Sequence, residues 1–141
     1  MEENIVSLRN NYSFEVINFI EPKYFIEEKN KNLNIEDICL SKYDFLFIKY
    51  TNIVQCFTLN GLFVNSFTTD EPITGFAIDE VTGNLMVSWG KKINKFERCN
   101  LKDAIEEEEQ QIGIQSVTFS QEYRMLLIIF ENNKVICPYI K

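Results

Sequence analysis

An internal repeat of about 40 residues restricts the fold of this chain more than any other feature of the sequence. The spacing Ile-x-x-φ-x-φ followed by Ser or Asp, where φ is apolar, occurs three times, beginning at Ile35, Ile73 and Ile114. Each copy continues with a second apolar run and then with a third run, aligned on Val54, Ile93 and Val135. Because several features recur in the same order, we expect one supersecondary unit to be repeated.

Each repeat predicts a small antiparallel sheet of four strands. In the copy that begins at Ile35 the strands are expected at 35–40, 45–50, 53–59 and 62–68. The Asn60-Gly61 pair predicts a type I′ hairpin turn, which requires a positive φ at both central residues. The second strand of each copy is apolar on both faces, as in FLFI and MLLIIF. Such a sheet must be covered on both sides, so we expect the sheets to stack.

Stacked four-stranded sheets of this length are typical of β-propeller blades. We therefore predict an all-β fold of about three and a half WD-repeat-like blades. The expected divisions are an incomplete blade (1–32), a blade at 33–70, a blade at 71–112 and a last blade (114–141) without a fourth strand. A closed propeller needs at least about four blades, so we expect a partial propeller. The alternative is a free-standing small β-sandwich that binds an unknown partner.

Charge and composition argue against several functions. The net charge of −7 would repel a phosphate backbone, so nucleic acid is not an expected partner. Histidine is absent, which removes the commonest general base and the commonest metal ligand. An enzyme that used the central cavity of a propeller would need polar groups at the start of each repeat, where the sequence has isoleucine. We expect no catalytic residues, no cofactor and no metal.

The four cysteines, Cys39, Cys56, Cys99 and Cys137, do not form a CxxC pair. Buried free thiols are favoured over disulfides or a zinc site. The sequence predicts neither a signal peptide nor a membrane-spanning segment. We expect a cytoplasmic protein that does not insert into membranes and reaches them only through the rest of a longer protein.

Trp89 and four loop acids are candidate partner-binding residues. Trp89 ends the second run of its repeat, where it could anchor a partner or pack between blades. Asp70 and Glu71 beside Pro72, and also Asp79 and Glu80, fall in loops between strands, where propellers bind partners. The alternative for these acids is a solvated turn.

The segment NLKDAIEEEEQQIG, residues 100–113, is the most acidic part of the chain. Leu101, Ala104 and Ile105 have helical spacing, so we expect an acidic linker with one or two helical turns in place of a fourth strand. Its glutamates, Glu106, Glu107, Glu108 and Glu109, could dock a basic partner or form a solvated face.

Four stretches resemble the C-terminal blades of the WD-repeat propeller that follows the BEACH domain in neurobeachin-like proteins. They are NIVQCFTLNGLFVNSF, EPITGFAIDEVTGNLMVSWG, KINKFERCNLKDAI and IGIQSVTFSQEYRMLLIIFENNKVICPYI. The usual Trp-Asp pair of WD repeats is replaced by Phe57-Thr58, Phe96-Glu97 and Pro138-Tyr139. The resemblance implies a non-catalytic scaffold in vesicle or membrane trafficking. Its expected partners are other proteins, including the missing blades of its own propeller.

Overall fold

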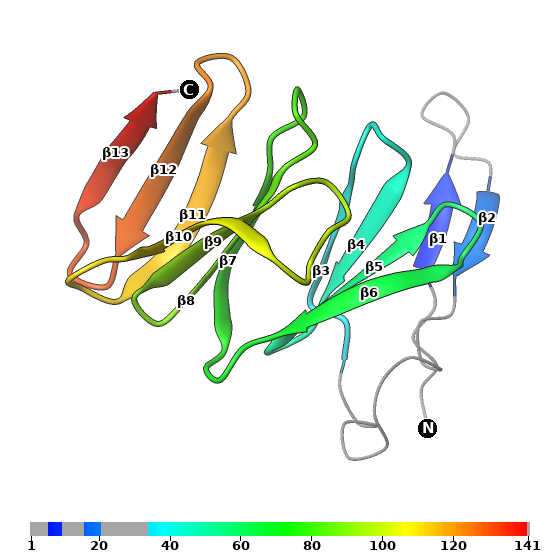
Figure 1. Ribbon diagram of the computed structural model, residues 1–141, viewed down its shortest axis with the longest axis horizontal. Coiled ribbons are helices and arrows are strands. Elements are labelled where there is room, and N and C mark those ends of the chain that lie inside the picture. Colours follow the sequence, from blue (N-terminus) through cyan, green and yellow to red (C-terminus); the bar gives the residue numbers. More distant parts are fainter. Residues whose placement is uncertain (1–5, 10–15, 21–33, 141) are drawn as a thin grey trace.

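The computed structural model describes residues 6–9, 16–20 and 34–140. Within these residues the secondary structure consists of β-strands alone (Figure 1). A short hairpin of β1 (Val6–Arg9) and β2 (Val16–Ile20) comes first. The rest of the incomplete blade expected at residues 1–32 lies outside the described residues.

Three larger antiparallel sheets follow, each with its strands in chain order. The first blade contains β3 (Asp37–Leu40), β4 (Phe45–Lys49), β5 (Ile53–Thr58) and β6 (Phe63–Thr68). The second blade contains β7 (Ile73–Ile78), β8 (Leu85–Trp89), β9 (Lys92–Phe96) and β10 (Ala104–Glu109). The third blade contains β11 (Ile114–Ser120), β12 (Met125–Phe130) and β13 (Val135–Ile140). The predicted fold class, with four-stranded antiparallel blades, is confirmed.

The cores lie between consecutive blades. One cluster joins Phe47, Val54 and Cys56 of the first blade to a set of buried residues that includes Val87 and Trp89 of the second blade. A second cluster joins the second and third blades, and a third covers the other face of the first blade. Because the second blade buries one face against the first blade and the other against the third, the two-sheet sandwich is not the fold.

A Ser or Asp at the end of the first strand of each blade organises the turn that follows. The side chain of Ser41 accepts a hydrogen bond of 3.0 Å from the backbone N–H of Tyr43, and Ser120 accepts one of 3.3 Å from Tyr123. Asp79 accepts one of 3.0 Å from the N–H of Val81. Local side-chain caps of this kind favour turns, and this explains why Ser or Asp recurs at this position.

The hairpin at Asn60-Gly61 is not the expected type I′ turn. Of the two residues only Gly61 has a positive φ, of 87°. The N–H of Gly61 bonds to the carbonyl of Thr58, and the N–H of Thr58 bonds to the carbonyl of Leu62. This pattern is a three-residue loop whose last residue, Gly61, is left-handed. Asn60 has a negative φ in this loop, so its position does not require a residue that favours positive φ.

The helix expected within residues 100–113 is also wrong. Residues 104–109 form β10, which pairs with β9 and completes the second blade. In this register Glu106 lies opposite Lys95 and Glu109 lies opposite Lys92. Adjacent glutamates repel one another on a helix, whereas cross-strand pairs with lysine favour the sheet.

Candidate protein-binding surface

Backbone hydrogen bonds fix one end of the blades in the same way at two successive places. The N–H of Ile73, which starts the second blade, donates 2.7 Å to the carbonyl of Thr51, and that of Ile114, which starts the third, donates 2.8 Å to Gly90. The connectors between blades are therefore held against the turn between the second and third strands. We call the end where these connectors and turns meet the connector end.

Asp70 and Glu71 lie exposed in the first connector, at the connector end. The carboxylate of Glu71 sits directly above Gly90, in space that a Cβ at Gly90 would occupy. Glu71 and Glu109 come together with Lys91, Lys92 and Glu131 around an open hollow of about 270 Å³. We call it the connector hollow; it does not include Asp70.

Trp89 is buried between the first and second blades, with 6% of its surface exposed. Its ring meets Phe67 edge-on at a centroid distance of 5.3 Å, and Phe67 meets Phe96 at 4.7 Å. The Trp89 side chain therefore packs between blades, which was one of the two alternatives that the sequence left open for this residue. A second open hollow of about 250 Å³ brings Trp89 near Glu107, Glu108 and Glu109.

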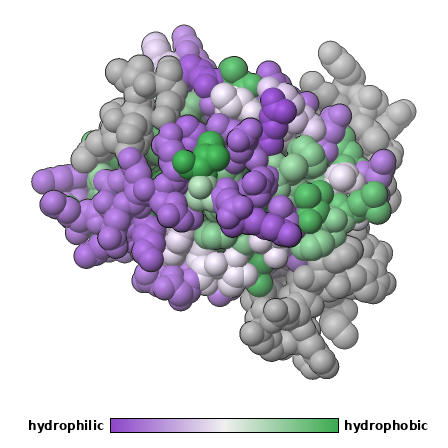
Figure 2. Space-filling view, viewed as in Figure 1, coloured by the Kyte–Doolittle hydropathy of each residue, from purple (hydrophilic) through white to green (hydrophobic). Residues whose placement is uncertain are grey.

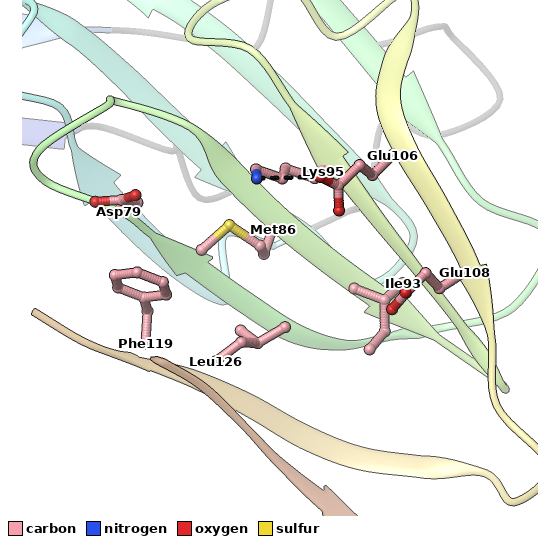
Figure 3. Close-up of a pocket in the computed structure, with 8 residues that line it drawn as sticks. All are labelled: Asp79, Met86, Ile93, Lys95, Glu106, Glu108, Phe119 and Leu126. Atoms are coloured by element: carbon pink, nitrogen blue, oxygen red, sulfur yellow. Dashed lines mark hydrogen bonds and ion pairs between the residues drawn. The ribbon is translucent and has the colours of Figure 1, made fainter. Parts of the chain in front are cut away.

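The four glutamates of β10 alternate between the two faces of the second blade. Glu106 and Glu108 line a narrow pocket beside the third blade, whose other walls include Met86, Ile93, Phe119 and Leu126 (Figure 3). Its cavity volume of about 30 Å³ is far below that of a small-molecule site. In the view of Figure 2, hydrophilic residues cover the surface over β10.

A chain of polar contacts between the loops that follow the first strands was not foreseen from sequence. Arg124 of the third blade donates hydrogen bonds of 2.6 and 2.7 Å to the two carboxylate oxygens of Asp79. Gln121 bonds to the carbonyl of Ile78 at 2.8 Å, and the Tyr43 hydroxyl donates 2.7 Å to the carbonyl of Val81. Asp79 is 3% exposed, so the expectation of a solvated turn is wrong for this residue.

Burial and ion pairing shift the pKa values of several described side chains. Burial raises the pKa values of the Cys39 and Cys56 thiols to about 12, which disfavours reactive thiolates. The ion pair with Lys49, assisted by Thr51, lowers the pKa of Glu36. Cys39, Cys56 and Cys99 are free thiols. Within the described residues no group of three His, Cys, Asp or Glu side chains is placed to hold a metal ion.

The described part of the chain contains no helix that is long and apolar enough to cross a lipid bilayer. The first residues of the second and third blades, Ile73 and Ile114, are buried apolar side chains. Ile73 belongs to the core cluster between the first and second blades, and Ile114 belongs to the cluster between the second and third.

No protein-family model and no curated protein sequence matches the chain. Solved structures with a similar fold do exist. The β-propeller domain of Myceliophteria thermophila Cps50 (Swd1) has 10% identity and a TM-score of 0.58, over 74% of this chain and 36% of that chain. The Neurospora crassa Pan2 WD40 domain has 11% identity and a TM-score of 0.63, over 99% and 43%.

A third structure is dihydro-heme d1 dehydrogenase NirN in complex with DHE. It has 11% identity and a TM-score of 0.68, over 92% of this chain and 28% of that chain. The chain thus spans less than half the length of each of these three structures. At such low identity the likeness shows the fold alone, which is a set of WD-repeat-like propeller blades.

Proposed function

We propose that the chain is a non-catalytic protein-interaction scaffold and that its blades form part of a longer WD-repeat propeller. The observation that carries this proposal is the outer face of the third blade. Ile129 and Val135 are neighbours on adjacent strands of this face. Their side chains are 37% and 61% exposed. Two branched apolar side chains on one sheet face favour a covering partner.

Register supports a blade as that partner. Ile129 pairs with Val135 in the third blade as Ser88 pairs with Ile93 in the second. Ser88 and Ile93 are buried, and Ile93 belongs to the cluster shared with the third blade. Ile129 and Val135 therefore occupy the positions in the third blade that correspond to Ser88 and Ile93 of the second blade. Because the third blade covers this face of the second blade, we propose that a further blade covers the outer face of the third.

Introducing two negative charges at the outer face tests this part of the proposal. We expect Ile129→Glu with Val135→Glu to lower the melting temperature of a longer protein that carries all of its blades, because a buried carboxylate lacks a partner. The matched control is Ile105→Glu, at an exposed apolar residue of β10. Equal melting temperatures for the two variants would show that no blade covers the face.

The connector hollow is the part of the surface that we propose for other proteins, together with Asp70. Loops held by a rigid scaffold commonly carry binding residues. Here Glu71, Glu131, Lys91 and Lys92 present charges of both signs on backbone fixed by the connector hydrogen bonds. Of the other expected residues, Glu106 and Glu108 face the third blade.

The resemblance of the blade sequences supports a finer proposal. We place the chain in the C-terminal propeller of a cytoplasmic BEACH-type protein that acts in vesicle or membrane trafficking and touches membranes indirectly. Proximity labelling in cells, with the full natural protein as bait, tests it. Enrichment of vesicle-associated proteins, lost in a Glu71→Lys, Glu131→Lys variant, is expected. An unchanged set of labelled proteins would argue against the connector hollow as the binding surface.

A further inference from the structure

The side chain of Asn94, in β9, is buried without a hydrogen-bond partner among the described residues. Asn94 is 7% exposed, and it lines the open hollow of about 250 Å³ at Trp89. A primary amide carries two donors and an acceptor oxygen, and burial without hydrogen bonds is unfavourable for such a group. The Asn94 amide is therefore left to bind water or a ligand that enters the hollow.

Register gathers polar side chains around this hollow, which we call the tryptophan hollow. Its lining residues are Trp89, Lys92, Asn94, Glu107, Glu108 and Glu109. Asn94 pairs with Glu107 across the sheet. Lys92 pairs with both Trp89 and Glu109, and cross-strand partners project to the same face of an antiparallel sheet. Trp89 belongs to the core cluster shared with the first blade, so the hollow lies on the face of the second blade that meets the first.

The charged side chains at the rim of the tryptophan hollow are not paired with one another. Lys92, Glu107 and Glu109 are exposed, and none of the three forms an ion pair or a side-chain hydrogen bond with a described residue. On the opposite face of the blade Lys95 and Glu106 do pair, at 3.4 Å. Two carboxylates beside one ammonium leave this rim with an excess of negative charge, which favours a cationic ligand.

The tryptophan hollow is continuous with the surface proposed above for partner proteins. Lys92 and Glu109 line both it and the connector hollow, whose volume is about 270 Å³. A protein segment seated in the connector hollow can therefore extend a side chain toward Asn94. The tryptophan hollow has room for one long side chain, since its volume of about 250 Å³ compares with about 30 Å³ for each water molecule in the liquid.

We propose that the tryptophan hollow binds an arginine side chain from such a segment of a partner protein. A guanidinium presents five N–H donors in a planar fork, which suits the carboxylates of Glu107 and Glu109 and the amide oxygen of Asn94. The carbon stem packs against the indole of Trp89. This inference rests on the proposed function as a protein-interaction scaffold and names the chemistry of one contact.

Other classes of ligand fit these groups less well. A phosphate would be repelled by the two carboxylates, and an aliphatic side chain would leave the Asn94 amide without a hydrogen bond. A lysine ammonium is a compact, strongly hydrated charge with three donors, so it bridges carboxylate and amide acceptors less well than a planar fork does.

Short peptides of the form acetyl-Gly-Gly-X-Gly-Gly-amide, with arginine, citrulline or lysine at X, are the probes for the purified chain. Citrulline has the shape of arginine without its charge. Binding is followed by the fluorescence of Trp89, the only tryptophan of the chain, and by the NMR signals of the Asn94 side-chain amide. We expect the arginine peptide to change both signals. Citrulline should bind at least about tenfold more weakly and lysine at least about threefold more weakly, because the charge or the planar fork is lost.

Adjacent glutamates of β10 provide a matched pair of variants. Glu107→Gln removes a charge at the tryptophan hollow, and Glu106→Gln removes the same charge one residue away on the opposite face of the strand. We expect Glu107→Gln to weaken arginine-peptide binding by at least about fivefold, and Glu106→Gln by less than about twofold. Equal weakening by both variants would show that general surface charge attracts the peptide, and would overturn the proposal.

A third variant, Asn94→Leu, separates binding from folding. Because the amide loses no hydrogen bond within the protein, this change of similar size should leave the melting temperature no lower, whereas it should weaken arginine-peptide binding by at least about fivefold. A lower melting temperature with unchanged binding would identify Asn94 as a structural residue and overturn the proposal. Citrulline or lysine binding as tight as arginine binding, or no signal change with any peptide, would also overturn it. The proximity-labelling test changes Glu71 and Glu131, which do not line the tryptophan hollow, so the scaffold proposal is judged separately.

Discussion

Arg124 and Asp79, 45 residues apart in sequence, form a two-point ion pair that ties the third blade to the second. The Asp79 side chain is buried and that of Arg124 is 24% exposed. Replacing Arg124 by alanine leaves a buried carboxylate without its cation, so we expect a loss of about 2–4 kcal/mol in the free energy of unfolding. Urea unfolding followed by circular dichroism measures it.

Asp79→Ser provides the control for this pair. Serine stands at the same position of the other two blades and caps the turn there. The variant keeps the cap and removes the buried charge, so Arg124→Ala should cost much less in its background. If Arg124→Ala cost the same in both backgrounds, the pair would have no energetic coupling.

Gly75 allows a close approach of the second and third blades. A Cβ there would lie 2.8 Å from the backbone nitrogen of Val117 and would overlap the side chains of Val117 and Ser88. We expect Gly75→Ala to lower the free energy of unfolding by about 1–3 kcal/mol. At Gly113 the three atoms nearest to a new Cβ all belong to the flexible carboxylate of Glu131. Gly113→Ala should therefore lower the free energy of unfolding by less than about 0.5 kcal/mol. If Gly113→Ala lowered it as much as Gly75→Ala does, this account of the contact between the second and third blades would be contradicted.

The repeat made the architecture predictable from sequence. Apolar patterns with period two, turn residues and a spacing of about 40 residues all point to the same stacked sheets, and tertiary packing agrees with them. Even the recurring Ser41, Asp79 and Ser120 mark a local event, because each caps the turn that follows it. Features that depend on neighbours in sequence are those that sequence analysis reaches best.

Features that depend on the partner strand or blade were missed. The residues of β10 have helical spacing and a poor strand propensity, and only pairing with Lys92 and Lys95 across the sheet makes them a strand. Nothing local to Asp79 indicates that Arg124 will reach it. Trp89 allowed two interpretations from sequence, because the choice depends on Phe67 in another blade.

Trp89 should act as a structural residue. Because its ring packs against Phe67 in the core between the first two blades, we expect Trp89→Ala to cost about 3–5 kcal/mol in the free energy of unfolding. Tyr123→Ala, at a side chain that is 65% exposed, should stay within about 0.5 kcal/mol. Chemical denaturation followed by far-UV circular dichroism compares the two. A cost below about 1 kcal/mol at Trp89 would contradict its placement.

Cys56 should make the stability of the chain fall at alkaline pH. Burial raises its pKa from 9.0 to about 12, with a smaller contribution from Cys99. The unfolded chain therefore releases the thiol proton at lower pH than the folded chain does. The folded state binds more protons between these values, so the free energy of unfolding decreases as the pH rises from about 9 to about 12 and is unaffected by this thiol below that range. Denaturant unfolding at several pH values should show a shallower decrease for Cys56→Ala. Iodoacetamide at pH 8 should leave Cys56 unmodified until urea unfolds the chain, and rapid native alkylation of Cys56 would contradict the burial.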